Sequence, residues 1–285
     1  MTNKYDIVGN FLKKCPPLWS TPLGYVLWRW LRSRRESDVR LLTTRRGLRF
    51  ELHLSQQYEA MIWLEHEDTQ DLLELEQLLK PGDVFVDVGA NVGLWTIHAA
   101  SATGRAGRVI AVEPNPVAYG RLLKNIRLND FDQLVRLVAA SVGRDRGRSP
   151  FYCNVRHNCS SSIPTAGSPA ITVDTLPLDS IVGDVHVAGI KIDVEGAELD
   201  VLHSAKEILH RDRPWIITEF NRSFTSARAL EDWPLYQYLN HLHYEAVKFG
   251  FGNRENTLRT LVRDGPHYFN VLFIHRQPAP AGAVV

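Results

Sequence analysis

The sequence predicts an α/β fold with a doubly wound, mostly parallel seven-stranded sheet, an antiparallel edge hairpin and a small N-terminal appendage. Three observations predict it. From residue 83 onward, short β-branched runs alternate with helical repeats of apolar residues, which is typical of a parallel sheet wound with helices. The first of these strands, 84–88, runs through a glycine turn into a helix. The chain closes with helix, strand, loop and strand, an order that permits an antiparallel edge.

Residues 1–55 form the predicted appendage. Up to residue 49 they hold eleven Lys and Arg against three Asp and Glu. A short basic, aromatic helix is predicted over 22–35, opened by Pro22. We expect it to pack on the main domain, with weak peripheral contact to a membrane or a partner helix as the alternative. Residues 39–54 alternate around a turn and predict a β-hairpin.

The main domain is predicted over 56–276, followed by a flexible tail at 277–285. It begins with an acidic helical stretch at 58–79. The Rossmann-like sheet then follows in chain order. Its expected strands are 84–88, 108–113, 134–139, 187–194, 215–219, 244–249 and 268–274, and its expected helices begin near 94, 116, 196 and 233. A polar insertion at 143–170 carries a predicted edge strand at 150–153.

Composition and charge narrow the class of protein. The formal net charge of +1 gives no overall attraction to nucleic acid or membrane, so we expect no nucleic acid as a partner. Three cysteines are too few for a disulfide framework. Because the chain has no signal-peptide pattern and no run of 18 apolar residues, we expect a cytoplasmic protein without a transmembrane segment.

The acids that end the first two strands indicate a nucleotide-like ligand. Asp87 is expected to face the cleft, and Glu113 lies where an acid binds the ribose hydroxyls in folds of this type. A nicotinamide site has a second glycine where this chain has Ala90, because the pyrophosphate needs close backbone approach. A cationic sulfonium needs no such approach and is attracted to Asp87. The pattern therefore favours S-adenosylmethionine over NAD.

Three runs and one acid carry a family resemblance. They are Asp87-Val-Gly-Ala-Asn-Val-Gly93, Ala111-Val-Glu-Pro-Asn-Pro116, Lys191-Ile-Asp-Val-Glu-Gly-Ala-Glu198 and Glu219. Together they resemble the FkbM family of S-adenosylmethionine-dependent methyltransferases, over roughly residues 58–275. The third run is much more specific to that family than the first two. The resemblance implies methylation, mostly of hydroxyls on sugars and natural-product scaffolds, with proteins and carboxylates among the acceptors of some relatives.

The resemblance also implies which residues bind the donor. Glu113 would bind the ribose and Asn115 would flank the adenine. The methionine part would be lined by Gly89, Ala90, Asn91 and Gly93, with Thr96 one turn along, and the adenine edge by Ala140 and Ser141. For Thr96 and Ser141, ordinary helix-cap or turn chemistry is the alternative interpretation.

Acids at the ends of the fourth and fifth strands are the candidates for catalysis. Asp193 and Glu195 are expected to point to one side, and Glu219 adds a third wall. Like charges in one cleft need a shared proton or a cation, and the candidate cations are the sulfonium, Lys191 and a divalent metal such as magnesium. Capping of the helix that follows is the structural alternative. No residue is assigned to a metal, and Cys153, His157 and Cys159 do not match zinc-ligand spacing.

The predicted activity is O-methylation of a hydroxyl on a saccharide or natural-product scaffold. Transfer to an alcohol needs in-line alignment and removal of a proton. The candidate bases are Asp193, Glu195 and His157, with Glu219 orienting the acceptor. The alternatives are a carboxylate, an amide nitrogen or a protein side chain as acceptor, and a non-catalytic binding module. Residues 1–55 are left open as a lid or a homodimer contact.

Overall fold

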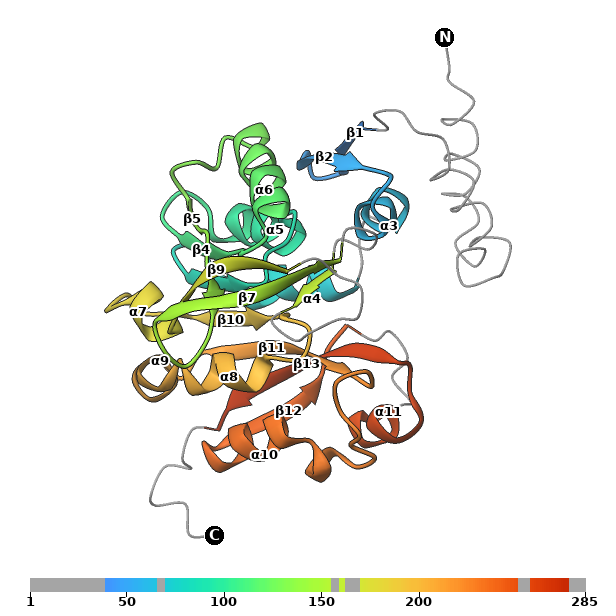
Figure 1. Ribbon diagram of the computed structural model, residues 1–285, viewed down its shortest axis with the longest axis vertical. Coiled ribbons are helices and arrows are strands. Elements are labelled where there is room, and N and C mark those ends of the chain that lie inside the picture. Colours follow the sequence, from blue (N-terminus) through green and yellow to red (C-terminus); the bar gives the residue numbers. More distant parts are fainter. Residues whose placement is uncertain (1–38, 66–69, 155–158, 162–169, 251–256, 277–285) are drawn as a thin grey trace, which may run out of the picture.

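The computed structural model describes residues 39–65, 70–154, 159–161, 170–250 and 257–276. A seven-stranded sheet in the order β12-β13-β11-β10-β3-β4-β5 forms its centre (Figure 1). Strands β3, β4, β5, β10 and β11 are parallel, and β13 is antiparallel to both of its neighbours. This confirms the predicted α/β fold, with its edge hairpin of β12 and β13.

The strands of this sheet lie close to their predicted positions. They are β3 (Val84–Val88), β4 (Arg108–Val112), β5 (Val135–Val138), β10 (Gly189–Ile192), β11 (Trp215–Asn221), β12 (Tyr244–Lys248) and β13 (Tyr268–His275). Strands β4 and β10 end earlier than predicted, so Glu113 and Asp193 begin the turns that follow them. The acids therefore lie at the carboxyl edge of the sheet, where ligands bind in folds of this kind.

Each face of the sheet has its own hydrophobic core, because side chains alternate along a strand. Val86 and Val88 of β3 pack on one face, and Phe85 packs on the other. The first core includes residues of α7 (Leu178–Val182), α8 (Glu198–His203), α9 (Lys206–Arg211), η2 (Leu230–Asp232), α10 (Pro234–His241) and α11 (Leu258–Asp264). The second includes residues of α3 (Gln57–Glu65), α4 (Gln70–Leu78), α5 (Leu94–Thr103) and α6 (Pro116–Leu128).

Two predicted helical stretches are divided in the structure. The stretch 58–79 forms α3 and α4, and the helix predicted after β10 forms α8 and α9. The apolar residues of the latter still pack together, because Val201, Leu202 and Leu209 are all buried in one core. Periodicity thus identified the buried face, although it missed the breaks. Helix α11 was not predicted.

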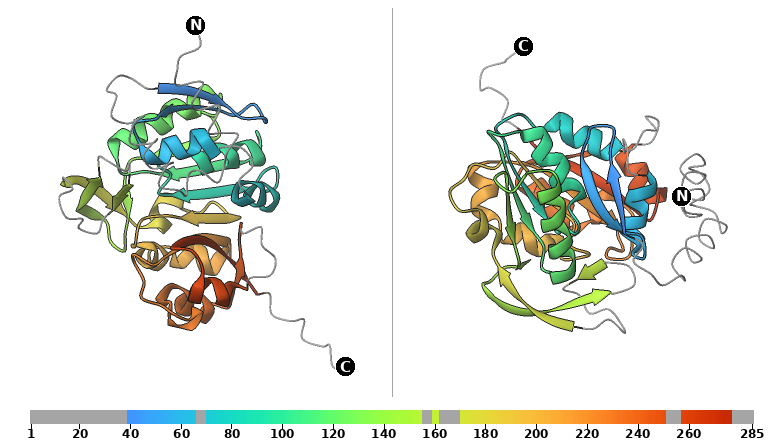
Figure 2. Two further views of the ribbon diagram at one scale, coloured as in Figure 1. Left: turned by 90° about the vertical axis from the view of Figure 1, so that its right-hand side faces the viewer. Right: turned by 90° about the horizontal axis from the view of Figure 1, so that it is seen from above.

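A second sheet corrects the prediction for residues 143–170. Strands β6 (Ser141–Val142), β9 (Ala170–Leu176), β7 (Gly147–Asn154) and β8 (Cys159–Ser161) form a separate four-stranded sheet in that order. Figure 2 shows it beside the main sheet. Strand β7 lies between β9 and β8, so the prediction that 150–153 is an edge strand is wrong. The polar composition of this segment conceals the sheet, because strand propensity is a weak signal without an apolar face.

The predicted hairpin at 39–54 is present as β1 (Val39–Thr43) and β2 (Arg49–His53), and it packs beside α6 (Figure 2). Asparagine amides bond its free edge. Asn129 accepts from the Arg49 N–H at 2.8 Å and donates to the Arg49 carbonyl at 2.7 Å, and Asn125 accepts from the Glu51 N–H at 2.7 Å. These bonds satisfy backbone groups that an edge strand otherwise exposes. The hairpin's apolar residues join the core beside α6.

The domain boundary at residue 55 stays a prediction. The helix predicted at 22–35 and the tail at 277–285 lie outside the described residues. Within the described residues, no helix has the length and apolar character needed to span a membrane.

Candidate active site

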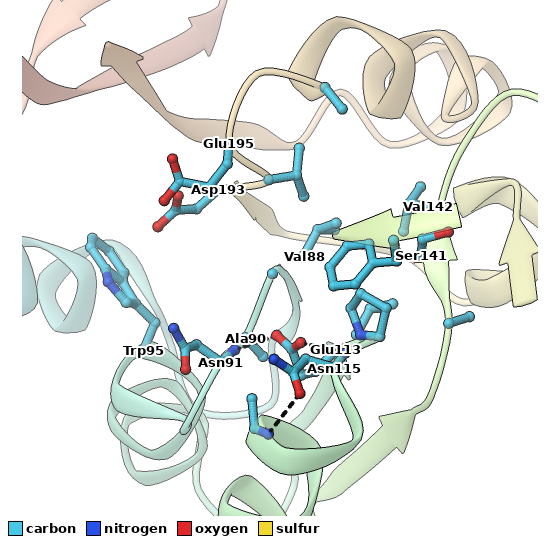
Figure 3. Close-up of a pocket in the computed structure, with 18 of the residues that line it drawn as sticks. Val88, Ala90, Asn91, Trp95, Glu113, Asn115, Ser141, Val142, Asp193 and Glu195 are labelled. Atoms are coloured by element: carbon cyan, nitrogen blue, oxygen red, sulfur yellow. Dashed lines mark hydrogen bonds between the residues drawn. The ribbon is translucent and has the colours of Figure 1, made fainter. Parts of the chain in front are cut away.

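A pocket opens at the carboxyl ends of β3, β4 and β10 (Figure 3). Its volume is about 890 Å³, including space open to solvent. It is lined by the predicted catalytic residues Asp193 and Glu195 and by seven of the predicted donor-binding residues: Gly89, Ala90, Asn91, Glu113, Asn115, Ala140 and Ser141. Residues from four parts of the chain, predicted as one site, therefore meet at one pocket.

The turn after β3 depends on glycine at position 89. Gly89 has φ +82°, and a Cβ there would lie 1.9 Å from the Asp193 carbonyl oxygen. Its N–H bonds the Val112 carbonyl at 3.0 Å, and the Asp193 N–H bonds the Val88 carbonyl at 3.0 Å. The missing side chain thus lets the ends of three strands approach one another. The clash that glycine avoids is with the protein's own backbone.

Glu113 is fixed by two backbone donors. The Asn91 N–H binds its Oε2 at 2.8 Å, and the Asn115 N–H binds its Oε1 at 2.7 Å. The residue is only 5% exposed. Burial raises the pKa of Glu113 to about 7, although both N–H bonds lower it. Each oxygen keeps further lone-pair capacity, so the carboxylate can accept a pair of hydroxyl donors from the pocket.

Asp87, Thr96 and Gly93 lie beneath the pocket. The sequence predicts that Asp87 faces the cleft, whereas the structure buries it completely. Thr96, also fully buried, donates its hydroxyl to Asp87 Oδ2 at 2.6 Å. Gly93, at φ +96°, caps α5. Among the described residues, none of the three lines the pocket, so they support the turn from below.

One end of the pocket combines apolar side chains with the capped N-terminus of α6. Asn115 Oδ1 caps α6 by accepting from the Val117 N–H at 2.9 Å. The Ser141 hydroxyl bonds the Thr175 hydroxyl at 2.8 Å, between the paired strands β6 and β9. Phe151 of β7 and Tyr58 of α3 also line the pocket. Sequence reasoning missed both, because neither lies near a motif.

The opposite end is acidic. The side chains of Asp193 and Glu195 point together toward the side where Trp95 lies (Figure 3). Alternation along a strand is not the reason, because both residues follow β10 and Glu195 adopts φ +55°. Lys191 Nζ lies 3.0 Å from Asp193 Oδ2. The predicted pairing of these acids is present, with Lys191 as their neighbouring cation.

Glu219 lines a neighbouring pocket at the ends of β10 and β11. This second pocket is lined by Gly196, Glu198, Leu199, Glu219, Asn221, Phe224, Thr225, Ser226, Asp232, Trp233, Pro234 and Leu235. Asn221 donates to Glu219 Oε2 at 2.8 Å. Burial and then the nearby charge of Asp193 raise the pKa of Glu219 to about 8. Glu198 caps the turn instead, accepting from the Gly196 N–H at 2.9 Å.

Two further predictions concern a base and a metal. His157 lies outside the described residues, so its part in the site stays a prediction. Among the described residues, no group of three His, Cys, Asp or Glu side chains is arranged to hold a metal ion. The structure therefore gives no support to the magnesium alternative.

The fold is Rossmann-like, and its pocket lies at the carboxyl ends of β3, β4 and β10. The family model "Methyltransferase FkbM domain" matches residues 87–246. The chain belongs to the FkbM family of S-adenosylmethionine-dependent methyltransferases. The match includes all three sequence runs on which the resemblance depends.

Individual relatives are more distant. Methyltransferase sdnD of Sordaria araneosa is 26% identical over 163 residues, covering 45% of this chain and 62% of the relative. A putative ribosomal RNA methyltransferase of Schizosaccharomyces pombe is 35% identical over 88 residues, covering 31% and 29%. Methyltransferase FkbM of Methylobacillus flagellatus KT aligns with a TM-score of 0.45 at 17% identity, covering 88% of this chain and 59% of that one. This chain thus matches less than two thirds of each.

Proposed function

We propose that this protein transfers the methyl group of S-adenosylmethionine to a hydroxyl of a small, uncharged acceptor such as a saccharide or natural-product scaffold. One observation carries the proposal. A single pocket has a backbone-held carboxylate, Glu113, at one end and a pair of carboxylates, Asp193 and Glu195, at the other. The first suits a ribose diol and the second a sulfonium, which are the two polar features of this donor.

The donor would lie across the pocket in one direction. Its adenine would occupy the apolar end between Phe151 and Asn115, and its ribose would bond Glu113. The methionine part would follow the turn of Gly89, Ala90 and Asn91, and Ala140 and Ser141 would border the adenine. The methyl group would then face Asp193 and the neighbouring pocket.

The second pocket supports an uncharged acceptor. It offers carboxylates, an amide, hydroxyls and the indole of Trp233. Among its described lining residues, none is basic. Arg222, beside Asn221 in sequence, donates instead to the Leu261 and Val262 carbonyls at 3.1 and 2.8 Å. A phosphate backbone binds through Lys and Arg, so RNA fits this pocket poorly.

The reaction is an in-line displacement at carbon. The acceptor oxygen bonds to the methyl carbon while the bond from carbon to sulfur breaks, and its electrons stay on sulfur. The hydroxyl proton passes to a base, for which Asp193 is our first candidate. Glu195 and Glu219 would orient the acceptor, with Glu219 carrying a proton at neutral pH. His157 is the alternative base.

The test uses the full chain with methyl-labelled donor and a panel of acceptors. The panel contains monosaccharides, polyhydroxylated natural products, carboxylic acids, peptides and RNA. We expect label in a hydroxyl acceptor, as an ether stable to mild base. Asp193→Asn should lower turnover by roughly 100-fold. The matched control is Asp200→Asn, which changes an exposed acid of α8 and should keep full turnover.

Other outcomes would reject the assignment. Label in RNA, in peptides or in a base-labile ester would identify one of the alternative acceptors. Unchanged turnover in Asp193→Asn would remove that residue as the base. Donor binding without transfer to any acceptor in the panel would favour the non-catalytic module.

Phe151 supplies a second prediction for the donor site. It is 6% exposed and reaches the pocket from the second sheet. Phe151→Ala should weaken donor binding by roughly tenfold, because apolar contact with the adenine is lost. Calorimetry with S-adenosylhomocysteine checks this. Phe224→Ala, in the second pocket, is the control and should leave that affinity unchanged.

A further inference from the structure

Lys191 is a buried cation beneath the acidic end of the donor pocket. Its side chain is 3% exposed, and its Nζ lies 3.0 Å from Asp193 Oδ2 and 4.0 Å from Asp87 Oδ1. Lys191 and Asp87 are register partners on neighbouring strands, so both project from one face of the sheet. The ammonium also lies 5.2 Å from the centre of the Trp95 ring, which lines the pocket.

This arrangement makes Lys191 the link between a buried acid and a pocket acid. Asp87 Oδ2 is bonded by Thr96, whereas its buried Oδ1 has no hydrogen-bond partner in the described part of the chain. A buried carboxylate is costly unless an opposite charge compensates it. Burial alone would lower the pKa of Lys191, but Asp193 and Asp87 outweigh it and raise that pKa. The ammonium of Lys191 therefore compensates the negative charge of both Asp87 and Asp193.

The charge of Lys191 should affect the binding of the donor and of the product differently. The donor carries a sulfonium charge, and S-adenosylhomocysteine carries none at sulfur. Carboxylates near the methyl position strengthen donor binding, and a fixed ammonium behind Asp193 weakens it. The titratable groups around Lys191 are Asp87, Asp193, Glu195 and Glu219, and the first three of these acids lie on or beside β3 and β10. Because Glu219 carries a proton at neutral pH, the charge there comes from the other three acids and Lys191.

We propose that Lys191 is a positioning residue that fixes the Asp193 carboxylate and sets the relative affinity of the site for the cationic donor and its neutral product. The inference rests on the proposed function, because it requires the donor in this pocket. The ion pair uses Asp193 Oδ2, which leaves Oδ1 to accept a hydrogen bond from an acceptor hydroxyl. Lys191 thus affects both the orientation of the base and the charge at the methyl group.

The test measures two affinities by calorimetry in the full chain. The dissociation constants of S-adenosylmethionine and S-adenosylhomocysteine give a ratio that depends on charge. In Lys191→Met, preference for the donor should increase on the order of tenfold, as expected for loss of one nearby positive charge at an effective dielectric constant of about 20. Lys191→Arg keeps the charge and should keep the ratio. A merely structural defect would weaken both ligands alike.

A second comparison of variants keeps the proposal testable if Lys191→Met does not fold. Lys191→Met leaves Asp87 buried without its cation, which can prevent folding. The single variant Asp87→Asn and the double variant D87N/K191M differ only at Lys191, and neither has that uncompensated charge. The ratio of the dissociation constants of S-adenosylmethionine and S-adenosylhomocysteine should differ on the order of tenfold between these two variants. Circular dichroism confirms that each variant is folded before binding is measured.

The two proposals fail in different ways. If the wild-type chain binds neither ligand, the proposed function is wrong. If it binds both, and the ratio changes less than twofold in Lys191→Met and between D87N and D87N/K191M, Lys191 does not set donor preference and the inference is overturned.

Discussion

Replacing Glu113 with Ala should weaken S-adenosylmethionine binding by roughly 100-fold or more. Two hydrogen bonds from the ribose to a charged acceptor would be lost, each contributing about 1.5–3 kcal/mol. The Asn91 and Asn115 N–H groups that hold the carboxylate would also lose their acceptor. Isothermal calorimetry measures the effect. Wild-type affinity in this variant would reject the assignment of the ribose end.

A matched control separates this effect from a general change in charge. Glu245→Gln alters an exposed glutamate of β12 at the far edge of the sheet, where its partner is Arg276. Donor affinity should be unchanged. Loss of binding in this control as well would show that calorimetry reports overall charge and not the Glu113 contact.

The raised pKa of Glu113 also predicts a dependence on pH. If the ribose binds the ionised carboxylate, a pKa of about 7 means that donor affinity rises about tenfold between pH 6 and pH 8. The free energy of unfolding of the protein without donor should fall as pH rises. The proton is bound more tightly in the folded state, so this contribution is complete below pH 4.5 and is lost as pH rises through about 7. The Glu113→Gln variant should show neither dependence.

Gly89→Ala should give the second large effect, on stability and donor binding together. The added Cβ would overlap the Asp193 carbonyl oxygen, and the position has φ +82°. Backbone strain costs about 1–2 kcal/mol, and overpacking against fixed backbone adds about 1–3 kcal/mol. The ends of β3 and β10 must separate, which displaces Asp193. Urea unfolding and calorimetry check the two effects.

The hairpin turn provides the control for this variant. Gly47 has φ +81°, close to that of Gly89, but a Cβ there would meet nothing within 4 Å. Gly47→Ala should therefore cost only the backbone strain and leave donor binding intact. Equal losses of stability in both variants would show that the contact with Asp193 does not matter.

Much of the proposed donor site was predictable because its motifs lie at the ends of predicted strands. The buried parallel strands are mostly apolar runs, and each leads into a turn with a glycine or a polar residue. Because the carboxyl ends of parallel strands meet at one edge of a sheet, Gly89, Glu113 and Asp193 were expected there together.

Other parts of the site depend on contacts between distant residues. Phe151 reaches the pocket through strand pairs in a second sheet, and Tyr58 reaches it through α3. Neither belongs to a motif. The two pockets were also invisible in the sequence, because the turn of Glu195 and Gly196, both at positive φ, directs neighbouring acids to different sides.

The sequence alone determined the fold class, the family and the edge of the sheet where the pocket lies, because these depend on local runs and their order. Only the tertiary structure decided the environment of each acid. Asp87, expected in the cleft, is buried on Thr96 and Lys191, and Glu113 is held by two backbone donors. The physical reason is that burial and ion pairing depend on neighbours from other strands, which a linear pattern does not specify.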